Sequence, residues 1–433
     1  MCLGICLMIL ATATIFPLTT KAVVGMPLTF YWARTFGGTG ADAATSTQST
    51  SDGGFIVGGT SNANIWLVKL DSKGNVEWQK TYGWGGVFSL RQTADGGYVV
   101  AAGPILRLDA SGNIVWEKTY SGYSALSVEQ TSDGGFITAG DTRTLTSGSG
   151  MLLRTNSSGD VIWQKTFLMN NGFPPSFWSV RQLSDGGFVA AGQTKSFGNG
   201  DIDAWVLRLD AAGNLMWDKS YGGLDSDLAF SIDMTSDGGF VVAGQSRSFS
   251  GGFMDAWVFK IDPAGSVVWQ KAYGGRGPGA FSVALSVQST PDSGFVVAGY
   301  TSGFGAGLND AWVFKLDSLG NPIWQRTFGG AGYDLAQSVA QASNGGFIVA
   351  GYMEVQPVIS HNSGALVLRL APDGNIPHCH IMGQSTPVAT DTNATVTILS
   401  GAGLNATSTA IITNATATNI SVQSNLQCIS PAI

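Results

Sequence analysis

Charged residues are scarce in this chain. They make up 12% of its 433 residues, against roughly 25% in an ordinary soluble domain. The 22 basic residues are outnumbered by 29 acidic ones, which gives a net charge of −7. A protein that binds the phosphate backbone needs a clustered excess of Lys and Arg to displace counterions. The composition therefore argues against nucleic acid as a partner.

Histidine is scarcer still, and the common catalytic motifs are missing. The sequence has no His-Glu-x-x-His, no Gly-x-Ser-x-Gly and no Gly-x-x-x-x-Gly-Lys. Of the three histidines, His361 stands alone, while His378 and His380 flank Cys379 and could ligate zinc with it. A closed zinc site needs four ligands, and no further Cys or His lies nearby. We therefore predict neither a metal site nor a cofactor.

Only four cysteines occur, and two of them flank the C-terminal part of the chain. We predict a disulfide between Cys379 and Cys428. It would close a loop of about fifty residues and stabilise the fold by about 4 kcal/mol in the chain-entropy model. Such a bridge is typical of an oxidising compartment.

Long apolar runs are also absent, with one exception at the N-terminus. The stretch from Cys2 to Leu18 is largely apolar, but shorter than the roughly 20 residues of a comfortable membrane span. Its length fits a secretory signal, although no basic residue precedes Lys21. We predict that residues 1–25 are a signal peptide or at most an N-terminal membrane anchor. The mature protein is then extracellular or at the cell surface.

Glycine, by contrast, is abundant, and much of it belongs to an internal repeat. The tetrapeptide Asp-Gly-Gly-aromatic, with two variants, occurs seven times at spacings of 38 to 55 residues. The copies begin at Asp52, Asp95, Asp133, Asp185, Asp237, Asp292 and Asn344. A typical repeat is long enough for four short strands with their turns. The repeat predicts an all-β fold, a seven-bladed β-propeller of four-stranded antiparallel blades.

Two other residues recur once per repeat. A Trp stands two residues before a Lys or Arg, at Trp32, Trp78, Trp116, Trp163, Trp217, Trp269 and Trp324. Burying a Trp is worth several kcal/mol, so we expect these side chains to pack the blades together. A serine stands six residues before each turn residue, at Ser46, Ser89, Ser127, Ser179, Ser231, Ser286 and Ser338. We expect the serines on the innermost strands, bonded to backbone groups of their neighbours.

The order of these elements predicts how the ring closes. Trp32 precedes the first Asp-Gly-Gly, whereas the last repeat continues beyond Arg369 without a Trp. The last blade is thus one strand short. An N-terminal strand around Tyr31–Phe36 would complete it and leave no sheet edge exposed. We predict that the propeller spans residues 26–377.

These motifs resemble the β-propeller repeat proteins found among secreted and surface proteins of prokaryotes. The resemblance covers about residues 30–375 and rests on units such as Ser-Asp-Gly-Gly-Phe, Asp-Ala-Trp-Val, Lys-Leu-Asp and Trp-Gln-Lys-Thr-Tyr-Gly-Gly. More distantly, Asp71, Gly74 and Trp78 with their counterparts are similar to the tryptophan-docking repeat of quinoprotein-type propellers. The resemblance implies a propeller fold. It does not imply a quinone cofactor, because those dehydrogenases use adjacent cysteines that this sequence lacks.

Loops of differing length are predicted on one face of the ring, where binding residues are usually found. They carry three pairs, Asp203 with Phe197, Asp255 with Phe249, and Asp310 with Phe304. Carboxylates beside aromatic rings predict a ligand-binding face for carbohydrate. The carboxylates could also hold Ca²⁺ with loop carbonyls, although no regular calcium-loop motif supports this. The structural alternative is that each Asp satisfies loop amides and each Phe packs on a neighbouring blade.

The C-terminal segment, residues 378–433, has a different composition. It contains no Lys or Arg, and Thr, Asn, Ala and Ser dominate residues 384–427. Alternation at 394–399 and 409–413 predicts a small hairpin, tied back by the disulfide. N-glycosylation acceptors begin at Asn393, Asn405, Asn414 and Asn419, and another in the propeller at Asn156. They predict an exposed glycosylated tail, with chance in a Thr/Asn-rich tract as the alternative.

Three functions fit these observations. We predict a noncatalytic propeller, secreted or at the cell surface, that binds glycans or envelope proteins through its variable-loop face. The first alternative is a hydrolase or lyase acting on polysaccharide through Asp residues at the propeller mouth, since glycoside hydrolysis needs two carboxylates. The second is an inert scaffold of the cell envelope.

Overall fold

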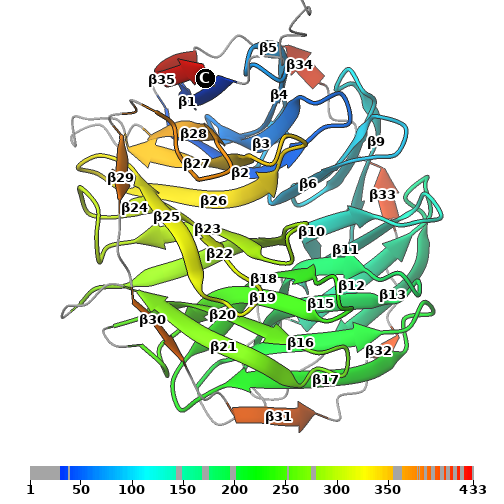
Figure 1. Ribbon diagram of the computed structural model, residues 1–433. Helices are drawn as coiled ribbons and strands as arrows, with labels where there is room; N and C mark the ends of the chain where they lie inside the picture. Colours follow the sequence, from blue (N-terminus) through cyan, green and yellow to red (C-terminus); the bar gives the residue numbers. More distant parts are fainter. Residues whose placement is uncertain are drawn as a thin grey trace, which may run out of the picture.

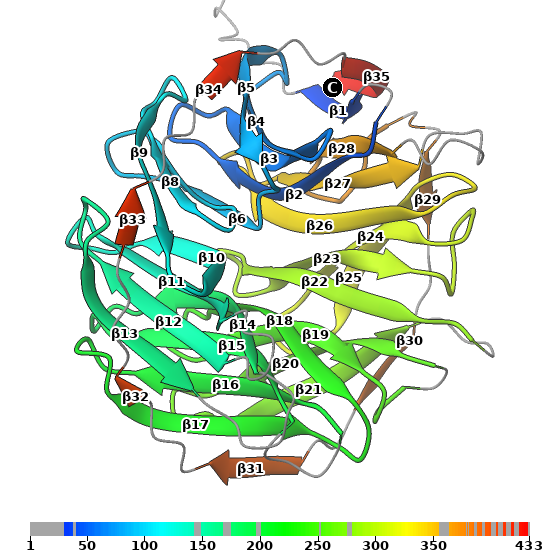
Figure 2. The ribbon, with the colours of Figure 1, turned by 180° about the vertical axis from the view of Figure 1, so that it is seen from behind.

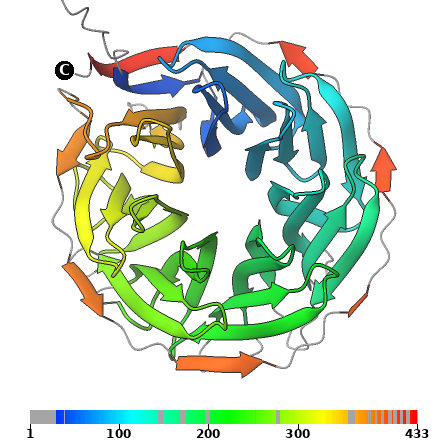
Figure 3. The same cartoon turned by 45° about the vertical axis from the view of Figure 1, so that its right-hand side comes forward.

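The computed structural model describes residues 30–37, 40–142, 149–167, 175–195, 201–250, 253–274, 279–354, 363–377, 379, 381–384, 388–391, 395–399, 404–405, 410–412, 417–419 and 424–431. In these ranges the regular structure is β, and the strands form seven antiparallel sheets around a central axis (Figure 3). None of the described residues belongs to an apolar helix of membrane-spanning length. The predicted seven-bladed β-propeller is confirmed.

Each blade has four repeat strands, which we call a to d in their order from the axis to the rim (Figure 1). Blades 1 to 3 consist of β2 (Asp42–Ser49), β3 (Phe55–Ser61), β4 (Asn64–Leu70) and β5 (Val76–Trp84); β6 (Ser89–Gln92), β7 (Tyr98–Ala101), β8 (Ile105–Leu108) and β9 (Ile114–Tyr120); and β10 (Tyr123–Gln130), β11 (Phe136–Thr142), β12 (Ser149–Thr155) and β13 (Val161–Phe167). Blades 4 to 6 consist of β14 (Ser176–Gln182), β15 (Phe188–Thr194), β16 (Asp203–Leu209) and β17 (Leu215–Gly222); β18 (Asp227–Met234), β19 (Phe240–Ser246), β20 (Asp255–Ile261) and β21 (Val267–Gly274); and β22 (Ser282–Ser289), β23 (Phe295–Thr301), β24 (Asp310–Leu316) and β25 (Pro322–Phe328).

Blade 7 joins the two ends of the repeat region. It consists of β26 (Asp334–Gln341), β27 (Phe347–Glu354), β28 (Ser363–Leu370) and the N-terminal strand β1 (Phe30–Phe36). In the register, Trp32 lies opposite Arg369, and the Trp32 side chain is fully buried. The predicted closure by an N-terminal strand is confirmed.

The Asp-Gly-Gly motif forms the turn between strands a and b. In blade 1 the amide of Gly53 donates to the carbonyl of Thr50 at 2.9 Å, with φ of +82° at Gly53. Glycine adopts a positive φ without a steric penalty, which explains why glycine occupies this position of the turn. The Asp52 carboxylate accepts the amide of Gly54 at 3.0 Å and pairs with Lys69 on strand c at 2.8 Å. Corresponding ion pairs join Arg107 to Asp95, Arg154 to Asp133, Arg208 to Asp185, Lys260 to Asp237 and Lys315 to Asp292.

Each repeated Trp docks on the c–d turn of the next blade. The ring of Trp78, for example, leaves no room for a Cβ on Gly112, which would meet it at 2.9 Å. The hydroxyl of Tyr82 donates to the carbonyl of the same glycine at 2.8 Å. Such contacts recur around the ring and end with Trp32 on Gly74. The tryptophans therefore join the blades to one another, as predicted.

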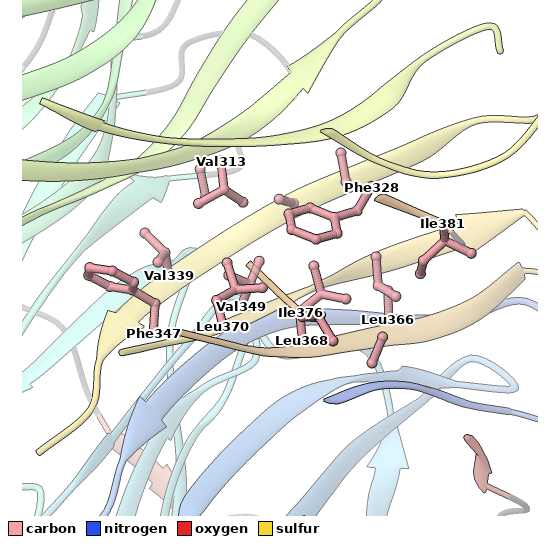
Figure 4. Packing of buried hydrophobic residues seen from close by; sticks show 14 of the residues in the cluster. Val313, Phe328, Val339, Phe347, Val349, Leu366, Leu368, Leu370, Ile376 and Ile381 are labelled. Carbon is pink, nitrogen blue, oxygen red and sulfur yellow. The ribbon is translucent and has the colours of Figure 1, made fainter. Parts of the chain in front are cut away.

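Buried residues form one hydrophobic cluster at each junction between blades. Figure 4 shows the cluster between blades 6 and 7, where Val313 and Phe328 face Leu366 and Leu368. Ile376 and Cys379 extend this cluster beyond the last repeat strand. Cys379 is 7% exposed and disulfide-bonded.

The chain beyond the repeats adds a fifth strand to every blade. We call these seven strands the belt: β29 (Met382–Gln384), β30 (Val388–Asp391), β31 (Thr395–Leu399), β32 (Leu404–Asn405), β33 (Ala410–Ile412), β34 (Ala417–Asn419) and β35 (Ser424–Pro431). In that order they pair with β25, β21, β17, β13, β9, β5 and β1. The belt therefore runs once around the rim, against the order of the blades (Figures 2 and 3).

The belt advances by seven residues per blade. On each outer strand, the residue that follows the repeated Lys or Arg pairs with one belt residue. These are Gly383, Thr390, Thr397, Leu404, Ile411, Thr418 and Asn425.

The predicted small hairpin is wrong, because β31 pairs with β17 and β33 with β9. The outer strands have unpaired backbone N–H and C=O groups along their edges. Pairing with these groups satisfies the hydrogen bonds of the C-terminal segment along the whole rim.

Candidate functional site

The three predicted carboxylates lie where strand c begins in blades 4, 5 and 6. Asp203, Asp255 and Asp310 are only 2%, 8% and 2% exposed. The Asp310 carboxylate accepts the amide of Ala306 at 3.0 Å. Burial raises the pKa of Asp310, while hydrogen bonds from loop amides oppose that rise. This geometry matches the loop-holding alternative and leaves little carboxylate surface for a ligand.

The predicted aromatic partners pack on strand c. The ring of Phe249 lies 5.7 Å from that of Trp257, and the ring of Phe304 lies 5.3 Å from that of Trp312. Phe197 lies outside the described residues. A ligand-binding role for these three pairs stays a prediction, and their contacts do not favour it.

The remaining candidate residues are His361, several residues of the C-terminal segment and Asn156 in one turn. His361, His378, His380, Asn393 and Asn414 lie outside the described residues, while Asn405 and Asn419 lie in belt strands. Asn156 occupies the c–d turn of blade 3, where its Oδ1 accepts the amide of Asp160 at 2.8 Å. Within the described ranges, no group of three or more His, Cys, Asp or Glu is arranged to hold a metal ion.

The structure instead reveals two adjoining cavities along the axis, of about 420 and 410 Å³. Both are lined by strand a of successive blades. The first opens toward the variable loops, and we call it the mouth cavity. The second lies toward the a–b turns, and we call it the inner cavity. Arg91 and Arg181 line both.

The repeated serines hold the wall of this channel together. Each hydroxyl accepts an amide N–H from strand a of the next blade, over 3.1–3.3 Å. The series is cyclic, since Thr47 of blade 1 donates to Ser338 of blade 7 at 3.2 Å. The prediction that the serines bond neighbouring backbone is confirmed. They hold the wall in register.

A β-bulge beside each serine determines what faces the mouth cavity. In six blades the register of strands a and b shifts at the residue before the serine. A bulge re-aims the extra residue, and these residues line the mouth cavity: Thr45, Leu126, Trp178, Phe230, Leu285 and Gln337. Phe88 takes the same position in blade 2. Trp178 and Phe230 contact each other with ring centroids 4.8 Å apart.

The inner cavity is polar and charged. The residues two places after the serines line it: Gln48, Arg91, Glu129, Arg181, Asp233, Gln288 and Ala340. The Arg181 Nε atom lies 3.2 Å from a carboxylate oxygen of Asp233 and 3.8 Å from one of Glu129. Arg91 donates to the carbonyl of Leu90 at 2.8 Å and forms no ion pair with a described residue.

Burial shifts the pKa values of charged groups in this cavity. Burial, together with repulsion from Arg181, lowers the pKa of Arg91 to about 10, although attraction to Glu129 and Asp233 opposes the shift. Burial raises the pKa of Glu129, although attraction to Arg181 and Arg91 opposes the rise. With its pKa near 10, Arg91 is charged at neutral pH and can bind an acidic group.

Sequence reasoning located the serines but missed the residues that line the channel. Five of the seven residues just before the serines are apolar, namely Phe88, Leu126, Trp178, Phe230 and Leu285. Aligning the repeats on the serine would have exposed this pattern. The bulge that turns these side chains toward the axis has no sequence signature of its own.

Comparison of the sequence with known protein families and with curated proteins finds no match. Solved propeller structures are similar in fold only. The Dos1 propeller has a TM-score of 0.49 at 12% identity, over 79% of this chain and 94% of that one. Sqt1 from Chaetomium thermophilum has a TM-score of 0.46 at 11% identity, over 77% and 97%. A protein of unknown function from Bacteroides caccae has a TM-score of 0.40 at 14% identity, over 63% and 87%.

Proposed function

We propose that this chain is a noncatalytic extracellular propeller that binds a glycan in its axial channel, entered from the variable-loop face. The observation that carries the proposal is the arrangement of the mouth cavity above the inner cavity. Bulged apolar and aromatic side chains surround the entrance, and amide and guanidinium groups lie below them. Ligand pockets commonly combine an apolar wall with a few polar groups that fix orientation.

The chemistry of sugars fits this combination. The C–H face of a pyranose is apolar and stacks on aromatic rings, and Trp178 with Phe230 offers two adjacent rings. Sugar hydroxyls donate and accept hydrogen bonds, which Gln48, Gln288 and Arg91 can return. The channel therefore supplies both kinds of contact that a sugar ring needs.

Binding without turnover is supported by the placement of the carboxylates. Glu129 and Asp233, the two acids of the inner cavity, both lie beside the Arg181 guanidinium. Neither lines the mouth cavity, where a bound sugar would first lie. An extracellular location is supported by the disulfide at Cys379. The predicted signal segment and glycosylation acceptors agree with it.

The test is a binding and turnover screen against oligosaccharides and envelope polysaccharides, with calorimetry on each hit. Trp178→Ala should weaken binding about tenfold or more, because it removes the stacking surface. Phe253→Ala removes a 52% exposed aromatic residue that lines neither cavity and serves as the matched control. Equal affinity of the two variants would place the site elsewhere. Release of sugar would assign the protein to the hydrolase or lyase alternative. Neither binding nor turnover with any member of the panel would favour the scaffold alternative.

A further inference from the structure

Blade 2 is shorter than the other blades at the variable-loop face. Its strands β6, β7 and β8 have four residues each, whereas β22, β23 and β24 of blade 6 have seven or eight. Only residues 102–104 connect β7 to β8, against residues 302–309 between β23 and β24. The short blade leaves a third cavity of about 470 Å³ beside the axis, which we call the notch.

The notch exposes an aromatic residue at a fixed position. Trp84 ends strand β5 and is 85% exposed. The two glycines that follow it make a tight corner. Gly85 donates to the carbonyl of Ala63 at 2.8 Å, and a Cβ on Gly86 would meet the Thr60 hydroxyl at 2.2 Å. The chain therefore turns close to its neighbour and presents the indole to solvent.

The notch adjoins the mouth cavity. Phe88, 46% exposed, lines both cavities. Trp84, Phe88 and Arg91 lie in one short stretch of chain that leads from the rim of the notch into the channel. A ligand long enough to reach out of the mouth cavity would pass over these residues in the reverse order, from Arg91 over Phe88 to Trp84.

The charge of the mouth cavity selects the ligand. Arg91 and Arg181 line the mouth cavity, and no Asp or Glu does. Arg181 is paired with Asp233, whereas Arg91 forms no ion pair with a described residue. The carboxylates of Glu129 and Asp233 line the inner cavity only. A ligand that enters from the variable-loop face thus meets positive charge first. Guanidinium groups bind carboxylate and sulfate oxygens through paired hydrogen bonds.

We propose that the notch and the mouth cavity form one binding track for an acidic glycan chain. An acidic sugar occupies the mouth cavity with its anionic group on Arg91. The following sugars cross Phe88 and end on Trp84. This inference rests on the proposed glycan-binding function and adds the class of ligand and the direction of the chain. The shared chemistry is a sugar ring with an anionic oxygen group, either carboxylate or sulfate.

The experiment uses the mature chain and two series of oligosaccharides of increasing length. Oligogalacturonates supply carboxylate, chondroitin sulfate oligosaccharides supply both groups, and cello-oligosaccharides are the neutral control. Affinity is measured by calorimetry, and melting curves confirm that each variant folds. We expect an acidic hexamer to bind at least about tenfold more tightly than a neutral one.

Two variants separate the parts of the track. Trp84→Ala should weaken the binding of a hexamer about fivefold to tenfold and leave a dimer unaffected, because only the longer chain reaches the notch. Arg91→Gln should abolish the preference for acidic over neutral chains, and Arg91→Lys should retain part of it. Phe253→Ala and Lys73→Gln, both at exposed residues, are the matched controls.

The outcomes distinguish this inference from the proposed function. If Trp178→Ala weakens binding while Trp84→Ala has the same effect at every chain length, the track is wrong and the channel site stands. If neutral and acidic chains bind equally, the charge argument is wrong. If an acidic peptide binds more tightly than any acidic glycan, the ligand class is wrong. If no oligosaccharide binds, both the inference and the proposed function fail.

A second inference concerns the ends of the belt and rests on separate observations. Cys379 is disulfide-bonded and lies in the buried cluster that includes Ala33. At the far end of the belt, Cys428 pairs in register with the same Ala33. Both ends of the belt therefore lie at blade 7, which contains β1. We infer that a Cys379–Cys428 disulfide closes the belt into a covalent hoop around the seven blades.

A protease site engineered between Leu399 and Leu404 tests the hoop. After cleavage, a denaturing gel without reductant should show the chain at full mass, and reduction should release a fragment of about thirty residues. The same cleavage in a Cys379→Ser variant should release the fragment without reductant. Release of the fragment from the unsubstituted chain without reductant would show that Cys379 pairs with another cysteine, and the hoop would be wrong.

Discussion

The ring and the belt use the same backbone pairing but differ in what their side chains contribute. The repeats of the ring place a fully buried Trp or Tyr at many junctions, such as Trp205, Trp257 and Tyr221. The sequence of the belt, residues 382–431, contains no aromatic residue and no Lys or Arg. The seven residues that mark its register are of five types, Gly, Thr, Leu, Ile and Asn, and none of these types occurs in every blade. Side-chain packing therefore leaves a visible repeat in a sequence, whereas pairing through the backbone leaves none.

The largest expected effect comes from opening the ring. Deletion of residues 26–37 removes β1 and leaves β28 and β35 without their partner. It also takes the buried Trp32 from the cluster between blades 7 and 1. We expect a loss of melting temperature of more than about 10 °C, or failure to fold. Calorimetry and size-exclusion chromatography measure it. A cooperative transition within a few degrees of the full chain would show that closure by β1 is dispensable.

Removal of the belt should have a smaller effect on folding. Deletion of residues 384–433 leaves the four inner strands of blades 1 to 6 and their clusters intact. It exposes the edges of the outer strands, which are templates for pairing with other chains. We expect a loss of only several degrees, together with concentration-dependent association in light scattering. If this deletion costs as much as loss of β1, the belt is part of the folding core.

Lowering the pH should change stability in opposite directions at the two faces of the ring. Hydrogen bonds from Lys260 and Thr235 lower the pKa of Asp237 to about 2. Burial raises the pKa of Asp334 to about 6, with added repulsion from Asp310 and Glu354. The first shift contributes stability that is lost as the pH falls from about 4 to 2. The second costs stability above pH 6, and that cost is relieved as the pH falls from about 6 to 4.

Melting temperatures measured from pH 8 to pH 2 test both signs. Asp334→Asn should remove most of a rise of a few degrees between pH 7 and pH 5. Asp237→Asn should reduce the loss below pH 4 by a smaller amount, because this carboxylate is 59% exposed and solvent screens its ion pair. A profile of Asp334→Asn that matches the unsubstituted chain would contradict the buried charge.

The smallest effect is expected for one hydrogen bond of the serine ring. Ser127→Ala leaves the amide of Val180 without its acceptor. Loss of such a bond costs about 1 kcal/mol, or a decrease of about 1–3 °C. Thr47→Ala is a comparison on strand a of blade 1, one residue after the repeated serine, where the side chain bonds within its own blade. A decrease above about 10 °C for Ser127→Ala would mean that the serines do more than align the strands.

Much of the ring could be predicted from the sequence because its repeats satisfy local rules. Glycine marks the turns with positive φ, Asp and Lys positions pair across them, and Trp marks the blade junctions. The missing Trp of the last repeat was enough to predict the closure by β1. The candidate site was harder. Asp203, Asp255 and Asp310 attracted attention as carboxylates on loops, yet they are buried against their own loops.

By itself the sequence determined the number of blades, their strands and the closure of the ring, because each depends on short-range patterns repeated seven times. Only the tertiary structure decided the course of the belt, because backbone pairing does not require particular side chains. It also decided which residues line the channel, since a bulge beside Ser179 turns Trp178 toward the axis. The track from Trp84 to Arg91 likewise depends on the short blade 2, whose notch exists only where neighbouring blades are longer.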